Sequence, residues 1–292
     1  MSLIPFFLVA AGLLQHGGQP LVVDHAWLTA RLAHPSTVVL HVGPRESYDA
    51  GHIPGARFLQ VSEISAPMDS GALPLELPSP ETLDSVLESK GISSGSQIIL
   101  YWADEWVTPT TRAVFTLTWA GLGGQVSVLD GGLAGWKAAG HDLSTDVPTE
   151  VRGDLVLHPD PTVVVDALWV QDRLGQDTVA ILDARLRRFY DGDSGNGRIP
   201  RPGHIAGAAS LPFDQVLTES EYFKPREELR QLFRNAGAAD GDVVVTYCHI
   251  GQQASALWFA ARLLGYDAKL YDGSYTDWAA RDSLPVAIPD PR

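Results

Sequence analysis

Residues 51–56 read GHIPGA, and residues 203–208 read GHIAGA. An apolar run and then a Tyr-Asp pair precede each hexapeptide, at residues 38–42 and 48–49 in the first copy and at residues 179–182 and 190–191 in the second. Parts that recur in the same order indicate one structural unit used twice along the chain.

The repeat continues beyond the hexapeptides. Short β-branched runs at residues 97–101 and 242–247 are typical of strands buried on both faces. Each run is followed by an expected helix, at residues 112–120 and 254–264, that ends at a glycine. A further apolar run leads to Trp136 in the first half and to Trp278 in the second. Strands that alternate with helices predict an α/β fold with two tandem domains, each a parallel sheet with helices on both faces.

The composition is that of a globular protein with room for two ordinary domains. The chain has 292 residues, of which 45% are hydrophobic and 19% charged. Its formal charge of -14 would repel nucleic acids and anionic membranes, so we expect no nucleic acid partner and no stable membrane association. The single cysteine cannot form an internal disulfide, and without a Cys/His cluster it does not indicate a zinc site.

The expected domain organisation follows from the repeat. We expect a first domain at residues 21–140, a polar linker at residues 141–161 and a second domain at residues 162–289, after an N-terminal extension at residues 1–19. Residues 2–14 form an apolar run that is too short to span a membrane but matches the core of a signal peptide, although no Lys or Arg precedes it. This favours export to the periplasm, and the alternative is a packed extension of a cytoplasmic protein.

The one cysteine, Cys248, follows the expected strand that ends at Tyr247 and precedes an expected helix. Ligands of parallel sheets bind beyond the carboxyl ends of the strands. Loop N–H groups and the helix dipole favour an anion there, so we expect the thiol, with an ordinary pKa of about 8.5, to be shifted toward the thiolate. A lone cysteine is often a small buried hydrophobe. The adjacent Gly251 and polar Gln252 and Gln253 favour a nucleophile instead.

Several segments together resemble the tandem-domain rhodaneses, which are thiosulfate and 3-mercaptopyruvate sulfurtransferases. They are residues 247–255 (YCHIGQQAS), the two hexapeptides, and the segments DGG and YDGS that precede Trp136 and Trp278. The resemblance covers nearly the whole chain from Pro20. It implies an enzyme in which Cys248 takes a sulfane sulfur from a small anionic donor as a persulfide and passes it to cyanide, a thiol or a protein acceptor. It implies no metal and no organic cofactor.

The first domain lacks the nucleophile. At the position of Cys248 it offers Trp102, Ala103, Asp104 and Glu105, with no sulfur and two acids that would oppose an anion. The resemblance therefore implies that the first domain is inactive and structural, and that it closes one wall of the site.

The resemblance also implies the substrate-binding loop, which comprises His249, Ile250, Gly251, Gln252 and Gln253. His249 either donates a hydrogen bond or carries a charge near its ordinary pKa of about 6.5. The alternative is a solvent-facing histidine without a role.

The sequence identifies the basic residues that would bind the anionic donor less clearly. Asp183 and Arg185 match an acid and an arginine at a strand end in the family, and we expect the two to pair and brace the domain. A second arginine of the family falls on Phe189, so Arg187 or, preferably, Arg188 must replace it. A solvated basic turn is the alternative.

Two other functions compete with sulfur transfer by an enzyme. A phosphatase of the same fold needs an arginine six positions after the cysteine, where this chain has Ala254. A persulfide carrier that delivers sulfur to a protein partner remains an alternative. The loop matches neither the basic residues that the resemblance implies for a thiosulfate enzyme nor the Gly-Ser pattern that it implies for a 3-mercaptopyruvate enzyme. Because the Gly-Ser pattern is absent, we favour thiosulfate as the donor.

Overall fold

The structure, a computed structural model, describes residues 18–67, 71–103, 106–149, 151–195, 197 and 199–288. The expected signal segment at residues 2–14 lies outside these residues, as do Asp104 and Glu105. Within the described ranges, no helix is both long and apolar enough to cross a membrane.

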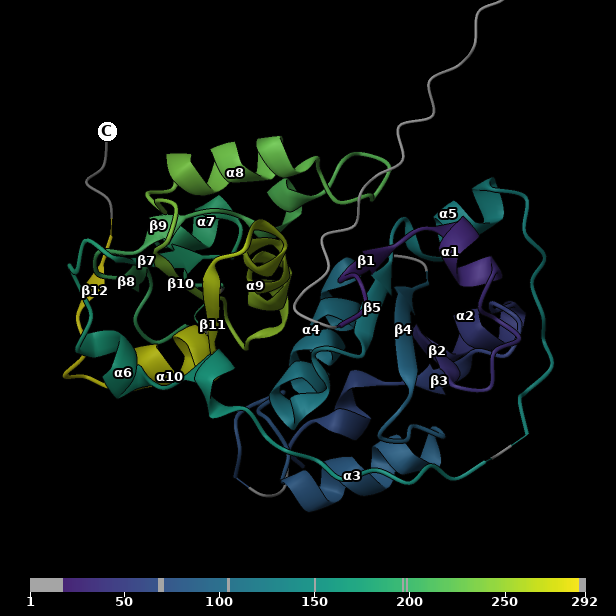
Figure 1. The fold of residues 1–292 in the computed structure, drawn as a ribbon. Coiled ribbons are helices and arrows are strands. Elements are labelled where there is room, and N and C mark those ends of the chain that lie inside the picture. Colours follow the sequence, from purple (N-terminus) through teal and green to yellow (C-terminus); the bar gives the residue numbers. More distant parts are fainter. Residues whose placement is uncertain are drawn as a thin grey trace, which may run out of the picture.

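The first half of the chain forms a five-stranded sheet in which every pairing is parallel (Figure 1). Its order is β1-β5-β4-β2-β3, so β4 is the central strand. The strands are β1 (Val22–Val23), β2 (Thr37–Val42), β3 (Arg57–Leu59), β4 (Gln97–Trp102) and β5 (Val126–Leu129).

The second half repeats this topology. Its parallel sheet has the order β6-β11-β10-β7-β9, which corresponds strand for strand to the first sheet. The strands are β6 (Val164–Val165), β7 (Val179–Asp183), β9 (Ala209–Ser210), β10 (Val243–Tyr247) and β11 (Asp267–Tyr271). A separate antiparallel pair joins β8 (His204–Ile205) to β12 (Val286–Ala287).

Helices cover both faces of each sheet. In the first half, α3 (Pro80–Ser89) and α4 (Val107–Leu117) bury one face, and α1 (His25–Thr29) and α5 (Gly132–Ala138) bury the other. In the second half, α8 (Arg226–Asn235) and α9 (Gln252–Leu264) bury one face, and α6 (Ala167–Gln171) and α10 (Ser274–Ala280) bury the other. The short helices α2 (Arg45–Ala50) and α7 (Arg187–Tyr190) each follow an inner strand. The predicted α/β fold with two tandem domains is confirmed.

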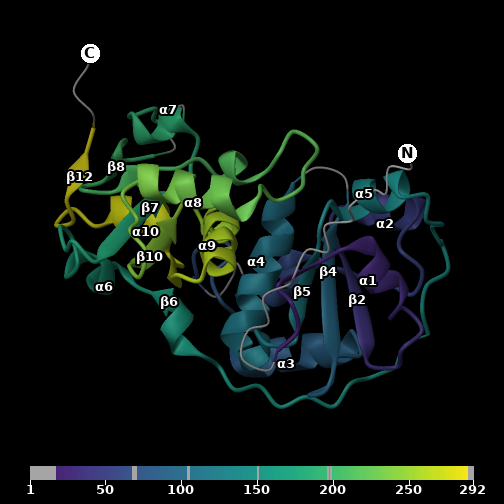
Figure 2. The same cartoon turned by 45° about the horizontal axis from the view of Figure 1, so that its top comes forward.

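The two halves meet through α4 and α9, which lie against each other between the sheets (Figure 2). The side chains of Thr111 and Ser255 share a buried hydrogen bond of 2.8 Å across this contact. Farther along, the rings of Phe115 and Trp258 meet edge to face with centroids 5.1 Å apart. One hydrophobic core therefore runs through both halves.

Both of these helices begin earlier than the sequence predicts. The first begins at Val107 instead of residue 112 and takes Pro109 into its first turn, where the missing N–H costs nothing because that group has no helical partner. The second begins at Gln252 instead of residue 254, directly after Gly251 in the left-handed conformation. The loop after the cysteine is therefore shorter than expected and ends at Gly251.

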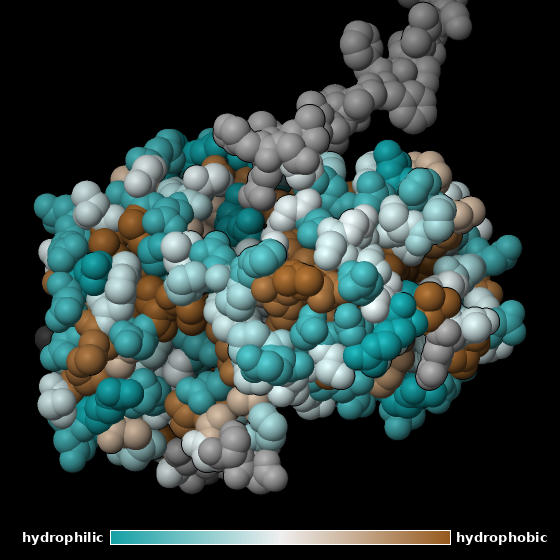
Figure 3. All heavy atoms as spheres, turned by 60° about the horizontal axis from the view of Figure 1, so that its bottom comes forward, coloured by the Kyte–Doolittle hydropathy of each residue, from teal (hydrophilic) through white to brown (hydrophobic). Residues whose placement is uncertain are grey.

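One face of the molecule shows how polar and apolar side chains are distributed on the surface. The face in Figure 3 is mostly hydrophilic, and its apolar side chains form separate patches. Such patches are usual on proteins that fold around their own core.

Candidate functional site

Cys248 lies at the carboxyl end of β10, the central strand of the second sheet. The strand passes between β7 and β11 and is buried from Val244 onward. Cys248 itself is only 1% exposed. It is followed by a turn that ends at Gly251, where α9 begins. The predicted position of the cysteine, between a buried strand and a helix, is what the structure shows.

Four backbone N–H groups face the sulfur, those of Ala254, Ile250, Gln253 and Gly251. Burial raises the pKa of the Cys248 thiol, and these four amides lower it by stabilising the thiolate, but burial has the larger effect. The expected shift toward the thiolate is therefore wrong in its net direction, because the sequence did not reveal how completely the thiol is buried.

A second loop, between β11 and α10, supports the cysteine. The Oγ of Ser274 accepts a hydrogen bond of 3.3 Å from the N–H of Cys248 and donates one of 2.9 Å to the carbonyl of Tyr271. The N–H of Tyr275 donates to the carbonyl of Cys248 at 2.9 Å. Ser274 is fully buried, and its backbone φ of 52° is one that residues other than glycine rarely adopt. Our sequence reasoning quoted this segment but gave Ser274 no role.

His249 is partly buried and neutral. Burial and, to a smaller extent, the nearby Arg185 lower its pKa while Asp183 partly opposes them, and the net pKa is about 4. Its ring meets that of Phe189 edge to face, with centroids 4.7 Å apart. The hypothesis that His249 carries a charge at neutral pH is therefore wrong, whereas a hydrogen-bonding role stays a prediction.

Asp183 and Arg185 form a fully buried pair behind the site. The Nη2 of Arg185 lies 2.6 Å from Asp183 and also donates to the carbonyl of Gly203 at 2.7 Å. Burial opposes the charge of Arg185, but hydrogen bonds and charge attraction from Asp183 raise its pKa. The guanidinium also lies 4.0 Å from the ring centre of Tyr275. The pair thus fixes the start of the second hexapeptide beside the loops of the site.

Arg187 and Arg188 lie at the surface on α7. Arg187 pairs with Asp191 at 2.9 Å, and Arg188 lies 3.8 Å from Asp193. Both side chains are more than half exposed. The residue of α7 that contacts His249 is Phe189. The assignment of Arg188 to the donor therefore stays a prediction, and it requires Arg188 to leave its surface partner.

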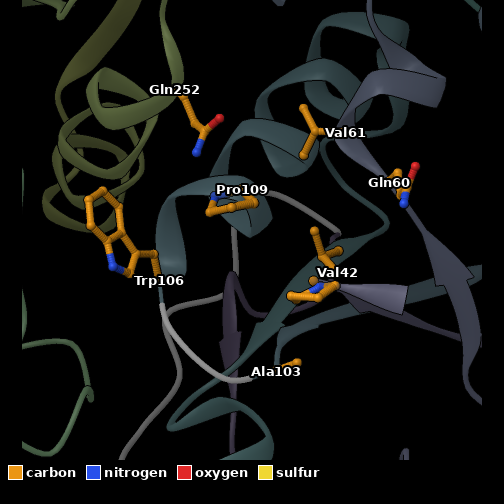
Figure 4. Close-up of a pocket in the computed structure, with 9 residues that line it drawn as sticks. Val42, Gln60, Val61, Ala103, Trp106, Pro109 and Gln252 are labelled. Atoms are coloured by element: carbon orange, nitrogen blue, oxygen red, sulfur yellow. The ribbon is translucent and has the colours of Figure 1, made fainter. Parts of the chain in front are cut away.

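The first half contributes a pocket of about 500 Å³ at the carboxyl end of its own sheet (Figure 4). It lies beside the residues that follow β2 and β4, at the edge of the first half that faces α9. Its wall includes Gln252, whose amide donates to the hydroxyl of Thr108 at 3.3 Å. The other lining residues are mainly apolar and are Val42, Gly43, Pro44, Gln60, Val61, Ala103, Trp106 and Pro109. Gln252 thus joins the loop of Cys248 to the first half.

Metal ligands do not gather around the cysteine. Among the residues that the structure describes, no group of three or more His, Cys, Asp or Glu side chains is arranged to hold a metal ion. The groups that could stabilise an anion at the sulfur are backbone amides and the start of α9.

Two copies of one parallel α/β unit, with the single cysteine of the chain at a strand end of the second copy, define a duplicated α/β fold with one candidate nucleophile. The family is given by sequence comparison. The model of the rhodanese-like domain matches residues 24–139 and again residues 166–281. The chain belongs to the rhodanese family, and the resemblance predicted from its motifs is confirmed.

Individual relatives agree with this assignment. The chain is 36% identical over 276 residues to a probable 3-mercaptopyruvate sulfurtransferase of Pseudomonas aeruginosa, covering 90% of this chain and 96% of the relative. It is 30% identical to a putative thiosulfate sulfurtransferase of Mycobacterium tuberculosis, covering 94% and 93% of the two chains. The crystal structure of the 3-mercaptopyruvate sulfurtransferase SseA from Escherichia coli superposes with a TM-score of 0.77 at 27% identity, covering 87% of this chain and 98% of SseA. The predicted enzyme class, a sulfurtransferase, is confirmed.

Proposed function

We propose that this protein transfers a sulfane sulfur from thiosulfate or 3-mercaptopyruvate to cyanide or a thiol acceptor through a persulfide on Cys248. The observation that carries the proposal is the position of the only cysteine, at a strand end where four backbone N–H groups face its sulfur. Such a cradle stabilises a thiolate before the reaction and a persulfide anion after it.

The first step loads the cysteine. The Cys248 thiolate attacks the outer sulfur of thiosulfate, a new S–S bond forms, and sulfite leaves with the electron pair of the old S–S bond. With 3-mercaptopyruvate, the C–S bond breaks instead, and its electron pair leaves on the enolate of pyruvate, which takes up the proton of the mercapto group. Both donors leave the same persulfide on the enzyme.

The second step unloads it. Cyanide or a thiolate attacks the terminal sulfur, and the electron pair of the S–S bond returns to the Sγ of Cys248. The products are thiocyanate or a new persulfide, and the free thiolate is regenerated. No electron is gained or lost by the enzyme over the full cycle, so the two half-reactions form a ping-pong scheme.

The charges around Cys248 leave the stabilisation of the anion mainly to the loop amides. The neutral His249 brings no cation to the donor, and the guanidinium of Arg185 is engaged by Asp183. The backbone N–H groups and the start of α9 are therefore the donors nearest to the developing anion. Arg188 remains our candidate for an outer contact with the donor, and thiosulfate remains the favoured donor.

The first half of the chain has a structural role in this proposal. It has no cysteine, and it supports the loop of Cys248 through Thr108 and α4. We place the catalytic domain at residues 162–289 and the structural domain at residues 21–140.

Steady-state turnover of thiosulfate and of 3-mercaptopyruvate, with cyanide as acceptor, tests the proposal. The wild type should turn over repeatedly, faster with thiosulfate, and Cys248→Ser should be inactive with both donors. Activity that survives this substitution would refute the mechanism. Loading of one sulfur without turnover would favour the persulfide carrier instead.

A further inference from the structure

Arg112, on α4 of the first half, is a fully buried cation that approaches the loop of Cys248 from the other domain. Its Nη2 lies 2.7 Å from a carboxylate oxygen of Asp272 and also donates to the carbonyl of Leu75. The second carboxylate oxygen of Asp272 accepts the N–H of Leu77 at 2.9 Å. Two segments of the first half thus hold one carboxylate of the second half.

Asp272 belongs to the loop that supports the cysteine. Two residues later, Ser274 accepts the N–H of Cys248, and Tyr275 donates to the carbonyl of Cys248. Any movement of Asp272 is therefore transmitted over a few bonds to the backbone of the nucleophile. Arg112 anchors this second loop to the first half of the chain.

Arg112 also packs on the loop that provides the amides. A Cβ added to Gly251 would lie 2.7 Å from the Nη1 of Arg112 and 3.4 Å from the carbonyl oxygen of Asp272. Among the described residues, Nη1 and Nε of Arg112 have no hydrogen-bond partner. A buried guanidinium with unpaired N–H groups costs free energy, so its ion pair with Asp272 has to offset that cost.

We propose that Arg112 is a positioning residue: by holding Asp272 and lying against Gly251, it keeps the loop amides directed at the sulfur of Cys248. The inference rests on the proposed role of Cys248 and gives the first half a task in the reaction. Arg112 is not among the groups that face the sulfur of Cys248. It acts through two loops of the other half.

The pH dependence of Cys248 alkylation by iodoacetamide in the full-length protein tests this inference. Cys248 is the only cysteine, so the midpoint of the profile reports one thiol. We expect Arg112→Met and Asp272→Asn each to raise the midpoint by about one unit, because both release the loops that aim the amides. The rate constant kcat/KM for thiosulfate at neutral pH should fall about tenfold in both variants.

The control is Arg262→Met. Arg262 lies on α9, and its Nη1 donates to the hydroxyl of Thr118 at 3.1 Å, at the other end of the contact between α4 and α9. The substitution removes a partly buried arginine from the contact between the two halves and changes neither loop. We expect its alkylation midpoint to equal that of the wild type, even if its melting temperature falls.

The two main variants separate position from charge. Arg112→Met removes a cation and Asp272→Asn removes an anion, so a purely electrostatic effect would move the two midpoints in opposite directions, and that result would overturn the inference. An Arg112→Met midpoint equal to that of the control would overturn it as well. If Arg112→Met does not fold, Arg112→Lys should show a smaller shift in the same direction.

Failure of the proposed function has a different signature. It would appear as wild-type protein that forms no persulfide with either donor. Failure of the present inference would appear as unchanged alkylation midpoints in the variants of Arg112 and Asp272.

Discussion

Replacing Gly251 by alanine should lower the rate of sulfur transfer by more than its effect on the stability of the fold explains. Gly251 has a φ of 82°, where a residue with a Cβ costs about 1–2 kcal/mol. The added methyl would also lie 2.7 Å from the Nη1 of Arg112, which is too close for any real Cβ. Overpacking of this kind in a buried site lowers the free energy of unfolding by about 1–3 kcal/mol more.

The guanidinium of Arg112 is buried and held by Asp272 and Leu75, so we expect the clash to be relieved at least in part by moving the turn that follows Cys248. Of the four amides that face the sulfur, one belongs to Gly251, and those of Ile250 and Gln253 lie within two residues of it. Loss of one such donor in comparable anion sites lowers the rate by roughly 100-fold to 1000-fold. We therefore expect kcat for sulfur transfer to fall by about 100-fold in Gly251→Ala.

The matched control is Gly265→Ala at the other end of α9. Gly265 has a φ of 93°, and a Cβ there would have no atom within 4 Å. The control therefore has the same backbone strain without the clash. Urea denaturation should show a loss of about 1–2 kcal/mol for Gly265→Ala and more for Gly251→Ala, and an enzyme assay should show wild-type kcat for Gly265→Ala alone. Wild-type kcat in Gly251→Ala, or an equal loss of kcat in both variants, would refute the reasoning.

Three further predictions concern His249, Ser255 and Arg188. The pKa of His249 is about 4 in the folded chain and about 6.5 in the unfolded chain, so the unfolded chain binds the proton first as the pH falls. The free energy of unfolding should therefore decrease between pH 6.5 and pH 4, by at most about 3 kcal/mol. Urea denaturation at a series of pH values should show this decrease in the wild type and not in His249→Gln. Ser255→Ala loses the buried bond to Thr111 and should be less stable by about 1–2 kcal/mol in the same assay, and an unchanged midpoint would contradict a close contact between α4 and α9. Arg188→Ala should raise KM for thiosulfate about tenfold with little change in stability, and an effect no larger than that of Arg187→Ala would remove Arg188 from the site.

The duplicated fold could be predicted because its signals are local. The hexapeptides and the apolar runs recur in the same order, and each run is long enough to be recognised as a buried strand. The starts of α4 and α9 could not be placed, because Pro109 and Gly251 usually mark loops and here lie within or next to a first helical turn. Tertiary packing of the two helices decides their length.

The position of Cys248 could also be predicted, since it depends only on the strand before it and the helix after it. The partners of Cys248 could not. Ser274 lies 26 residues away and acts through an unusual backbone angle, and Arg112 belongs to the other half of the chain. The net pKa of the thiol and that of His249 depend on burial, which a single sequence does not quantify. Contacts between distant segments and the depth of burial are set by the assembled fold.

Mass spectrometry of the protein after treatment with thiosulfate tests the central claim most directly. The account predicts that the intact chain gains the mass of one sulfur atom, that peptide fragmentation places it on Cys248, and that cyanide removes it. Cys248→Ser should gain nothing. A wild-type protein that turns over thiosulfate while its cysteine never carries the added sulfur would contradict the account.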